Sequence, residues 1–463
     1  MAVVLLITTF VPDAPVAPDT TWPQFRGPAG RAVSAIETLP STWSTTINIA
    51  WKTDVPGRGW SSPIVWGDQV IVTSAVGSGA FKQPSPGIYG NDYVAELQRQ
   101  GLSEEQIMEK LRLRDLESPQ EAGELQFMVY SLDVKTGNVR WERTAHTGPP
   151  VGGRHRKNTY ASETPATDGA RIYALFGNIG LFCYSMDGTL LWTHKIAPQP
   201  RYLDFGTAAS PVVHEGRVYF QDDNEGDSFL AALDAKTGAV IWKTPRTIGG
   251  GRPLSGWSSP YVWTNTKRTE IVTIGRQLAV SYDLDGKELW RLKGLTQANP
   301  TPTAGDGMLY LGTGSQGESN RPLFAVKSGA AGDISLKAGE TSNEFVAWFQ
   351  PRAAAYTSSP LVFAGRVYAV NDTGILQVFD ARTGREIYKA RVGGVGNTFS
   401  ASPWACGGKV YFLSEEGDTF VIKPGDAYEE VSRNSLGELA LASPAVTRDG
   451  LFIRTQSRLY RIK

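Results

Sequence analysis

Short apolar stretches alternate with glycine-containing turns along most of the chain, and the same order of elements keeps returning. A small-residue triplet ending in proline precedes an apolar stretch, a glycine turn and a second apolar stretch, as in GWSSPIVWGDQVIVTSA from Gly59. A third stretch ends near an aspartate, and a TG or DG turn then leads to a fourth that ends in an aromatic residue. Alternation with period two predicts β-strands, and the glycine turns predict hairpins. Each unit therefore predicts four short antiparallel strands.

The unit occurs eight times, and the last copy is completed by the other end of the chain. Six of the seven spacings between the anchoring prolines lie between 41 and 58 residues, which is typical of propeller blades. The eighth copy stops after three strands at LYRIK, and NIAWKTDV with Trp51 supplies its fourth strand. We predict an all-β, eight-bladed β-propeller over 22–463, whose ring closure removes an exposed sheet edge. The anchoring prolines are Pro63, Pro165, Pro211, Pro260, Pro302, Pro360, Pro403 and Pro444.

An aromatic residue closes most of the fourth strands, shortly after the TG or DG turn. The fullest copies read DVKTGNVRW, DAKTGAVIW and DARTGREIY. We expect each aromatic ring to dock against the neighbouring blade. The predicted docking residues are Trp51, Trp141, Trp192, Trp242, Trp290, Trp348 and Tyr388.

These phrases resemble the tryptophan-docking motif A-x-D-x-x-T-G-x-x-x-W of the pyrroloquinoline quinone (PQQ) propeller superfamily. The resemblance runs from about Trp22 to Lys463, although DGTLLW and DGKELW lack Thr-Gly and IKPGDAYEEV lacks the tryptophan. WPQFRGPAGRAVS, RGWSSP and RHRKNTYASETP look most like exported bacterial PQQ-binding-like β-propeller repeat proteins. The superfamily includes quinoprotein dehydrogenases and non-catalytic propellers such as BamB, so the resemblance implies a fold more than a chemistry.

The segment 77–126 lengthens the first repeat and changes from a strand pattern to a helix pattern. Ser103 and Gln106 have the spacing of a capping box, and Gly101 suits a helix end. We predict a helical hairpin inserted in blade 1, which is either a lid or partner-docking arm or a solvated insert packed on its own blade. A smaller insertion at 328–344 is expected to be a loop.

Composition and the N-terminus limit the function classes. Forty-six basic residues balance forty-six acidic residues, so no electrostatic footprint for nucleic acid exists. The run MAVVLLITTF within 1–21 resembles a truncated signal peptide and is too short to span a bilayer, so we expect a periplasmic or extracellular protein. No cysteine follows it, which argues against a lipoprotein. The two cysteines, Cys183 and Cys406, form no disulfide framework or metal motif.

Basic residues recur in the connections between blades, which meet at one mouth of a propeller channel. Arginines at such a mouth would focus a positive potential and suit carboxylates or phosphates. The sequence thus raises an anionic small-molecule site, with surface ion pairing as the alternative. The predicted basic residues are Arg58, Arg154, Lys157, Arg201, Arg252 and Arg352.

Two further groups could contribute chemistry. His155 and Glu163, within RHRKNTYASETP, are candidate acid/base residues, with Asn158 and Tyr160 as neighbouring ligand contacts. Trp60 and Trp257 occupy equivalent GWSSP positions and could stack on a planar ligand or simply pack between blades.

We therefore expect a non-catalytic binding or interaction scaffold whose partner is an envelope protein or an anionic small molecule. The first alternative is a PQQ-dependent dehydrogenase of alcohols or sugars, with PQQ and calcium as cofactors. Against it, the vicinal cysteine pair of many such enzymes and a calcium-ligand set are missing from the sequence. The second alternative is a BamB-like envelope assembly factor.

Overall fold

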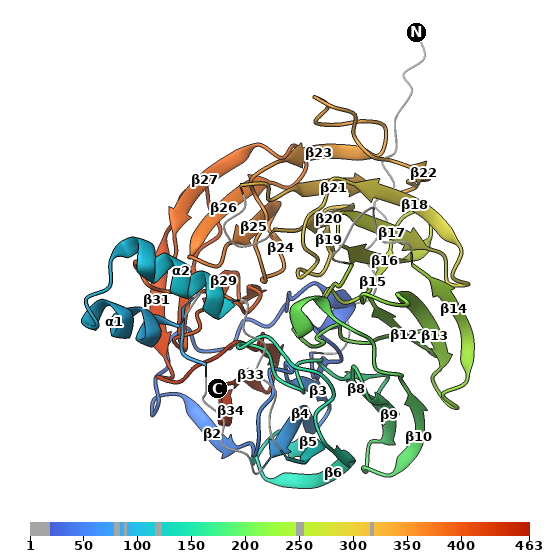
Figure 1. The fold of residues 1–463 in the computed structure, drawn as a ribbon, viewed down its shortest axis with the longest axis vertical. Coiled ribbons are helices and arrows are strands. Elements are labelled where there is room, and N and C mark those ends of the chain that lie inside the picture. Colours follow the sequence, from blue (N-terminus) through green and yellow to red (C-terminus); the bar gives the residue numbers. More distant parts are fainter. Residues whose placement is uncertain (1–18, 78–83, 88–89, 116–122, 247–253, 315–318) are drawn as a thin grey trace.

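The strands form eight sheets arranged in a ring (Figure 1), which confirms the predicted eight-bladed propeller. The computed structural model describes residues 19–77, 84–87, 90–115, 123–246, 254–314 and 319–463. The N-terminal run at 1–18 and Arg252 lie outside the described residues. No helix in the described part of the chain is long and apolar enough to cross a membrane.

Each blade is built around four antiparallel strands, which follow one another along the chain in blades 1 to 7 except that β22 (Gly332–Asp333) lies between the last two strands of blade 5. Blade 1 contains β3 (Ile64–Trp66), β4 (Gln69–Gly77), β5 (Leu125–Asp133) and β6 (Val139–Gly148). Blade 2 contains β7 (Ala166–Thr167), β8 (Arg171–Phe176), β9 (Gly180–Ser185) and β10 (Leu190–Lys195). Blade 3 contains β11 (Val212–His214), β12 (Arg217–Asp222), β13 (Phe229–Asp234) and β14 (Val240–Pro245). Blade 4 contains β15 (Tyr261–Thr264), β16 (Thr269–Gly275), β17 (Leu278–Tyr282) and β18 (Glu288–Lys293).

The second half of the ring repeats the pattern. Blade 5 contains β19 (Thr303–Gly305), β20 (Met308–Gly312), β21 (Leu323–Lys327) and β23 (Val346–Gln350). Blade 6 contains β24 (Leu361–Phe363), β25 (Arg366–Val370), β26 (Ile375–Asp380) and β27 (Glu386–Arg391). Blade 7 contains β28 (Trp404–Cys406), β29 (Lys409–Leu413), β30 (Asp418–Ile422) and β31 (Glu430–Ser435). Blade 8 contains β32 (Ala445–Thr447), β33 (Gly450–Arg454), β34 (Arg458–Ile462) and the N-terminal strand β2 (Ile49–Asp54).

Pairing of β2 with β34 closes the ring, as the truncated last repeat predicted. The register runs from Ile49 opposite Ile462 to Asp54 opposite Arg458. Lys463 then donates its backbone N–H to Asn48 O at 3.0 Å. Blade 8 therefore combines strands from the two ends of the described chain.

Tryptophan rings join consecutive blades at five of the predicted docking positions. Each indole Nε1 donates to a backbone carbonyl in the next blade at 2.8–3.2 Å. The ring also lies against the glycine of the next TG or DG turn, where a Cβ atom would come within 2.5–2.8 Å of the indole. The turn therefore needs glycine both for its positive φ and for this close approach. The five residues are Trp51, Trp141, Trp192, Trp242 and Trp348.

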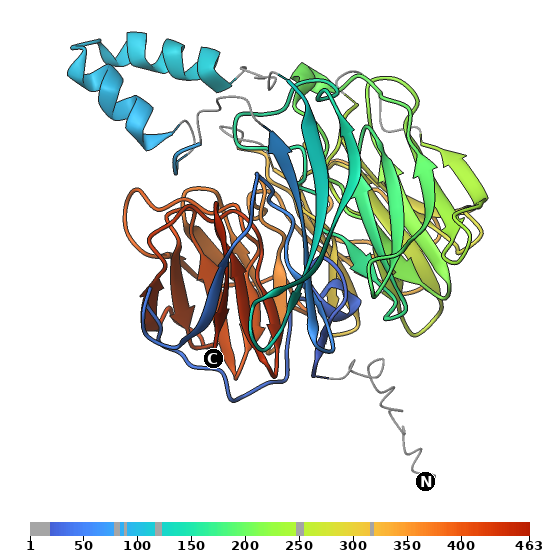
Figure 2. The ribbon, with the colours of Figure 1, turned by 90° about the horizontal axis from the view of Figure 1, so that it is seen from below.

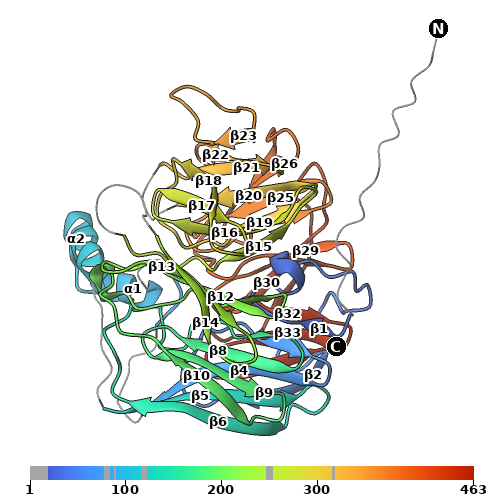
Figure 3. The same ribbon diagram turned by 90° about the vertical axis from the view of Figure 1, so that its right-hand side faces the viewer.

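Trp290 differs from these five tryptophans, because its indole N–H does not donate to the next blade. Its Nε1 donates to Glu270 Oε2 at 2.7 Å within blade 4, and its side chain is fully buried. A strand from the 328–344 insertion, β22 (Gly332–Asp333), pairs in parallel with the outer strand β18 beside it (Figure 3). The expected loop thus adds a fifth strand to blade 4 and covers Trp290.

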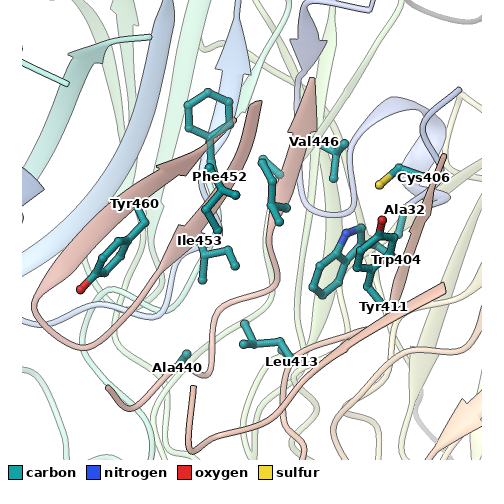
Figure 4. Packing of buried hydrophobic residues seen from close by; sticks show 14 of the residues in the cluster. Ala32, Trp404, Cys406, Tyr411, Leu413, Ala440, Val446, Phe452, Ile453 and Tyr460 are labelled. Carbon is teal, nitrogen blue, oxygen red and sulfur yellow. The ribbon is translucent and has the colours of Figure 1, made fainter. Parts of the chain in front are cut away.

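An N-terminal strap, residues 19–48, crosses one face of the ring before β2 begins. Its strand β1 (Thr21–Trp22) pairs with β3 of blade 1, and Pro23 O accepts the N–H of Thr167 in blade 2. Arg26 Nη2 donates to Pro360 O of blade 6 at 2.6 Å. The strap then reaches blade 7, where Ala32 lies beside Trp404 (Figure 4). The strap therefore links blades 1 and 2 to blades 6 and 7, which the blade order places apart in the ring.

A helical arm projects from blade 1 on the opposite face of the ring (Figure 2). It consists of α1 (Asn91–Arg99) and α2 (Glu104–Asp115). Ser103 and Gln106 make the reciprocal hydrogen bonds of a capping box, Ser103 N to Gln106 Oε1 and Gln106 N to Ser103 Oγ. Leu97 and Leu111 are buried, whereas Met108 is 58% exposed.

Candidate axial binding site

A cavity of about 270 Å³ lies on the ring axis, and all eight blades contribute to its lining. Each blade supplies the hydroxyl residue that directly precedes its anchoring proline. We call these eight residues the hydroxyl ring: Ser62, Thr164, Ser210, Ser259, Thr301, Ser359, Ser402 and Ser443.

Backbone hydrogen bonds hold the hydroxyl ring in place. The N–H of each ring residue from blade 1 to blade 7 donates to the side-chain oxygen of the next blade at 2.9–3.2 Å. Within the described residues, none of the seven accepting hydroxyls donates its own hydrogen to a protein acceptor. These O–H groups therefore remain free to donate to whatever occupies the cavity.

A buried arginine joins blade 8 to blade 1. Arg454 Nη1 donates to Ser61 Oγ and to Thr73 O, both at 2.6 Å. Burial lowers the pKa of Arg454 to about 9, because it removes water from the charged guanidinium, and Tyr130 opposes this effect only in part.

Aromatic and amide side chains line the cavity together with the hydroxyl ring. Trp60 Nε1 donates to Lys157 O at 2.9 Å, and Trp257 Nε1 donates to Gly206 O at 2.8 Å. These bonds hold both predicted tryptophans in place at the cavity. Gln297 and Asn299 also line it, from the connection between blades 4 and 5.

Lys157, Asp372 and Glu415 line the cavity, and each is engaged in an ion pair. Lys157 Nζ lies 2.5 Å from Glu415 Oε2, and this carboxylate also accepts from Ser400 Oγ and from the N–H of Gly87, at the root of the helical arm. Burial acts to raise the pKa of Glu415, but Lys157 and the hydroxyl donors outweigh it and hold the pKa below its ordinary value. Asp372 is likewise paired with Arg321 at 2.9 Å.

The predicted arginine-lined mouth does not form among the described residues, because the chain buries or disperses these side chains. Of the predicted basic residues, Lys157 lines the cavity. Arg154 is buried and donates to Asn158 O within its own loop. Arg201 is buried in an ion pair with Asp222 at 2.5 Å.

The remaining predicted residues divide between the cavity and other sites. Arg352 is exposed, and Arg58 lines a small side pocket that also contains Trp60 and Asn158. His155 and Asn158 line the axial cavity itself. Tyr160 does not: its hydroxyl donates to Gly152 O at 2.9 Å.

Glu163 and His155 line different spaces, so the two predicted acid/base residues do not share a site. Glu163 Oε1 accepts from Thr207 Oγ1 at 2.5 Å and from the N–H of Gly177, in a small buried space between blades 2 and 3. Its Oε2 has no hydrogen-bond partner. Burial raises the pKa of Glu163 above its ordinary value, against the opposing effect of the Thr207 hydroxyl.

The donor set at the cavity does not fit a calcium-bound PQQ. PQQ carries three carboxylates, but Lys157 is already neutralised by Glu415. Glu415 and Asp372 are engaged with cations and hydroxyls, and no group of three His, Cys, Asp or Glu within the described residues could hold a metal ion. Cys183 and Cys406 are both free and buried.

Comparison with known proteins agrees with this architecture. A polyvinylalcohol dehydrogenase from a Pseudomonas species is 26% identical over 204 residues, which cover 35% of this chain and 30% of that protein. A europium-containing methanol dehydrogenase superimposes with a TM-score of 0.60 at 11% identity, covering 96% of this chain and 98% of that chain. BamB from Moraxella catarrhalis gives a TM-score of 0.51 at 14% identity, covering 73% of this chain and 89% of that chain.

The ring and its axial cavity thus define an eight-bladed β-propeller. A family model described as outer membrane protein assembly factor BamB matches residues 106–244 and 226–331. This family model covers just under half of the chain and supports a PQQ-like, BamB-like propeller family. The solved structures share the fold at low identity, and the curated relative is matched over less than a third of its length.

Sequence reasoning missed the hydroxyl ring, although its signal is visible. A Ser or Thr precedes the anchoring proline in all eight repeats, which is more than a strand start requires. Phe25, Asp372 and Glu415 were also missed. Phe25 belongs to the strap, and the two acids lie in strand-connecting turns without a recognisable motif.

Proposed function

We propose that the chain is an exported, non-catalytic propeller that acts as a binding scaffold. The observation that carries this proposal is the pairing of the charged groups lining the axial cavity. Glu415 is bonded to Lys157, and Asp372 to Arg321. A catalytic acid or base needs a proton-accepting or proton-donating position facing the substrate, whereas these groups are committed to structure. Such a cavity suits binding.

The test is to incubate the purified protein with PQQ, with and without calcium, and to follow binding calorimetrically. Alcohol- and sugar-dependent reduction of an artificial electron acceptor is measured in parallel. We expect neither tight PQQ binding nor turnover. Turnover that is lost in His155→Gln would overturn the proposal in favour of the dehydrogenase alternative.

The dehydrogenase alternative has its own supporting observation. His155 lines the cavity, with its ring edge-on to Phe205 at a centroid distance of 4.8 Å, and the curated relative is a dehydrogenase. The BamB-like alternative is supported by the family model. In that role the partner would be an envelope protein that binds blade edges or the helical arm.

A further inference from the structure

We infer that the axial cavity binds a neutral, hydroxyl-rich small molecule of the carbohydrate or polyol class. This inference rests on the proposed binding function and names its ligand. It replaces the anionic ligand expected from the arginines, because none of the predicted arginines that the structure describes lines the cavity.

The paired charges at the cavity favour a neutral ligand. The Lys157 side chain is 13% exposed and the Glu415 side chain 3%, so the pair is already shielded from water. A charged ligand would lose its hydration on entering and would find no uncompensated counter-ion among the described lining residues. To gain one, it would have to separate Lys157 from Glu415 and leave a buried charge unpaired. A neutral ligand meets neither cost.

The hydroxyl and amide groups of the lining favour a ligand with many hydroxyl groups. Seven of the eight hydroxyls in the ring accept a backbone N–H, and none of the seven donates its own hydrogen to an acceptor among the described residues, so their O–H groups can donate to a ligand. Gln297 and Asn299 add amide groups that both donate and accept. A ligand with many hydroxyls can accept from the ring and donate to the amides, which an exclusively apolar ligand cannot do.

The two tryptophans of the lining favour a ligand that also has an apolar C–H surface. Trp60 and Trp257 are held by hydrogen bonds to neighbouring loops, so their indoles are positioned before a ligand arrives. Each can pack against the apolar C–H surface of a sugar or cyclic polyol while its polar edge stays bonded to protein.

Size and access limit the ligand to a small unit. A volume of about 270 Å³ lies at the lower end of ligand pockets. Phe25 of the strap lines the cavity, and the strap crosses the face opposite the helical arm. A polymer threaded through the channel would meet the strap, so the ligand is expected to enter from the arm side.

A series of compounds of similar size and different charge tests the inference. Glucose, gluconate and glucosamine are similar in size but neutral, anionic and cationic, and myo-inositol adds a neutral cyclic polyol. Binding is measured by saturation-transfer NMR and calorimetry at neutral pH. We expect glucose or inositol to bind, and both charged relatives to bind at least about tenfold more weakly.

Equal or tighter binding of gluconate or glucosamine would overturn the neutral-ligand inference. So would the absence of binding by the whole series. In either case, absence of PQQ-dependent turnover would leave the scaffold proposal standing, whereas PQQ binding with turnover would overturn both.

Two variants locate the site. Trp257→Phe should weaken binding of the neutral ligand about tenfold, because the larger packing surface and its anchoring hydrogen bond are lost. Trp263→Phe is the matched control, since Trp263 is a buried tryptophan of the same blade that does not line the cavity. Circular dichroism checks that both variants are folded. Equal loss of affinity in the two variants, or no loss in Trp257→Phe, would contradict binding at the axis.

Discussion

Glu163 and Glu415 show how two buried carboxyl groups of the same type acquire opposite properties. Both are almost fully buried, at 1% and 2% exposed. Glu415 has a lysine, a hydroxyl and a backbone N–H, and its pKa is lowered. Glu163 has one oxygen without a partner, and burial raises its pKa. The neighbours, and not burial alone, decide which form is stable.

Glu163→Gln should stabilise the protein at neutral pH. Because the folded-state pKa lies above the ordinary value of 4.5, the unfolded chain ionises first as pH rises, and stability falls between these two values. The glutamine variant carries no charge and lacks this fall. We expect a gain of the order of 1 kcal/mol at pH 7.5 and little difference near pH 4, measured by urea unfolding.

Glu415→Gln is the control with the opposite sign. Its folded-state pKa is lowered, so the carboxylate contributes stability above its ordinary pKa that is lost as pH falls through the folded-state value. The variant leaves Lys157 buried without its carboxylate and should cost about 3–5 kcal/mol at neutral pH. If the two variants changed stability in the same direction at pH 7.5, these assignments would be wrong.

The sequence located the polar loop 154–163 but could not sort its side chains. His155, Lys157 and Asn158 line the cavity, whereas Arg154, Tyr160 and Glu163 are directed elsewhere. A strand pattern predicts alternate faces, but an irregular loop has no such period. The partners of Lys157 and Glu163 also lie on other loops, at Glu415 and Thr207.

At the scale of the element, the repeated hairpin was predictable because its residues are local. The Asp234 side chain accepts the N–H groups of Lys236 and Thr237, and Gly238 adopts a φ of 72°. The exception, Trp290, was not predictable. Its acceptor Glu270 lies on β16, and the covering strand β22 comes from a later insertion with little strand pattern.

Gly238→Ala should destabilise the propeller more than Gly216→Ala. Both glycines have nearly the same positive φ, 72° and 74°, so an alanine pays about 1 kcal/mol of backbone strain at either position. A Cβ at 238 would also lie 2.5 Å from Trp192, whereas a Cβ at 216 meets nothing within 4 Å. We expect an extra loss of about 1–3 kcal/mol for Gly238→Ala, measured by chemical unfolding. Equal losses would contradict the docking of Trp192 on this turn.

At the scale of the whole molecule, the strap connects blades that the ring itself keeps apart. It contacts blades 1, 2, 4, 6 and 7, and Asp19 O also accepts the N–H of Arg448 in blade 8. The eight-bladed ring follows from the repeat period, but the strap does not repeat, so its path had no sequence signal.

Removal of residues 1–36 should leave the ring folded and expose Cys406. This thiol is buried next to the bridge between Val33 and Ala405, and burial raises its pKa to about 11. Cys183 is buried within blade 2, away from the strap, and serves as the internal control. Ellman's reagent under native conditions should label one thiol in the shortened chain and none in the full chain. Labelling that persists in a shortened Cys406→Ala variant would mean that the ring itself has opened.

The shared blade has a consequence for the order in which the protein matures. Asp54 bonds to Arg458 across 404 positions of sequence, so β2 leaves the ribosome long before its partner strand exists. Until synthesis is complete, β2 and the strap have an incomplete binding surface, and the nascent ring has an open edge. Blades 1 to 7 can assemble in turn, but the final closure is a late, long-range step, and such contacts form slowly. The strand β2, which is made before any other strand of blade 8, is therefore among the last to pair.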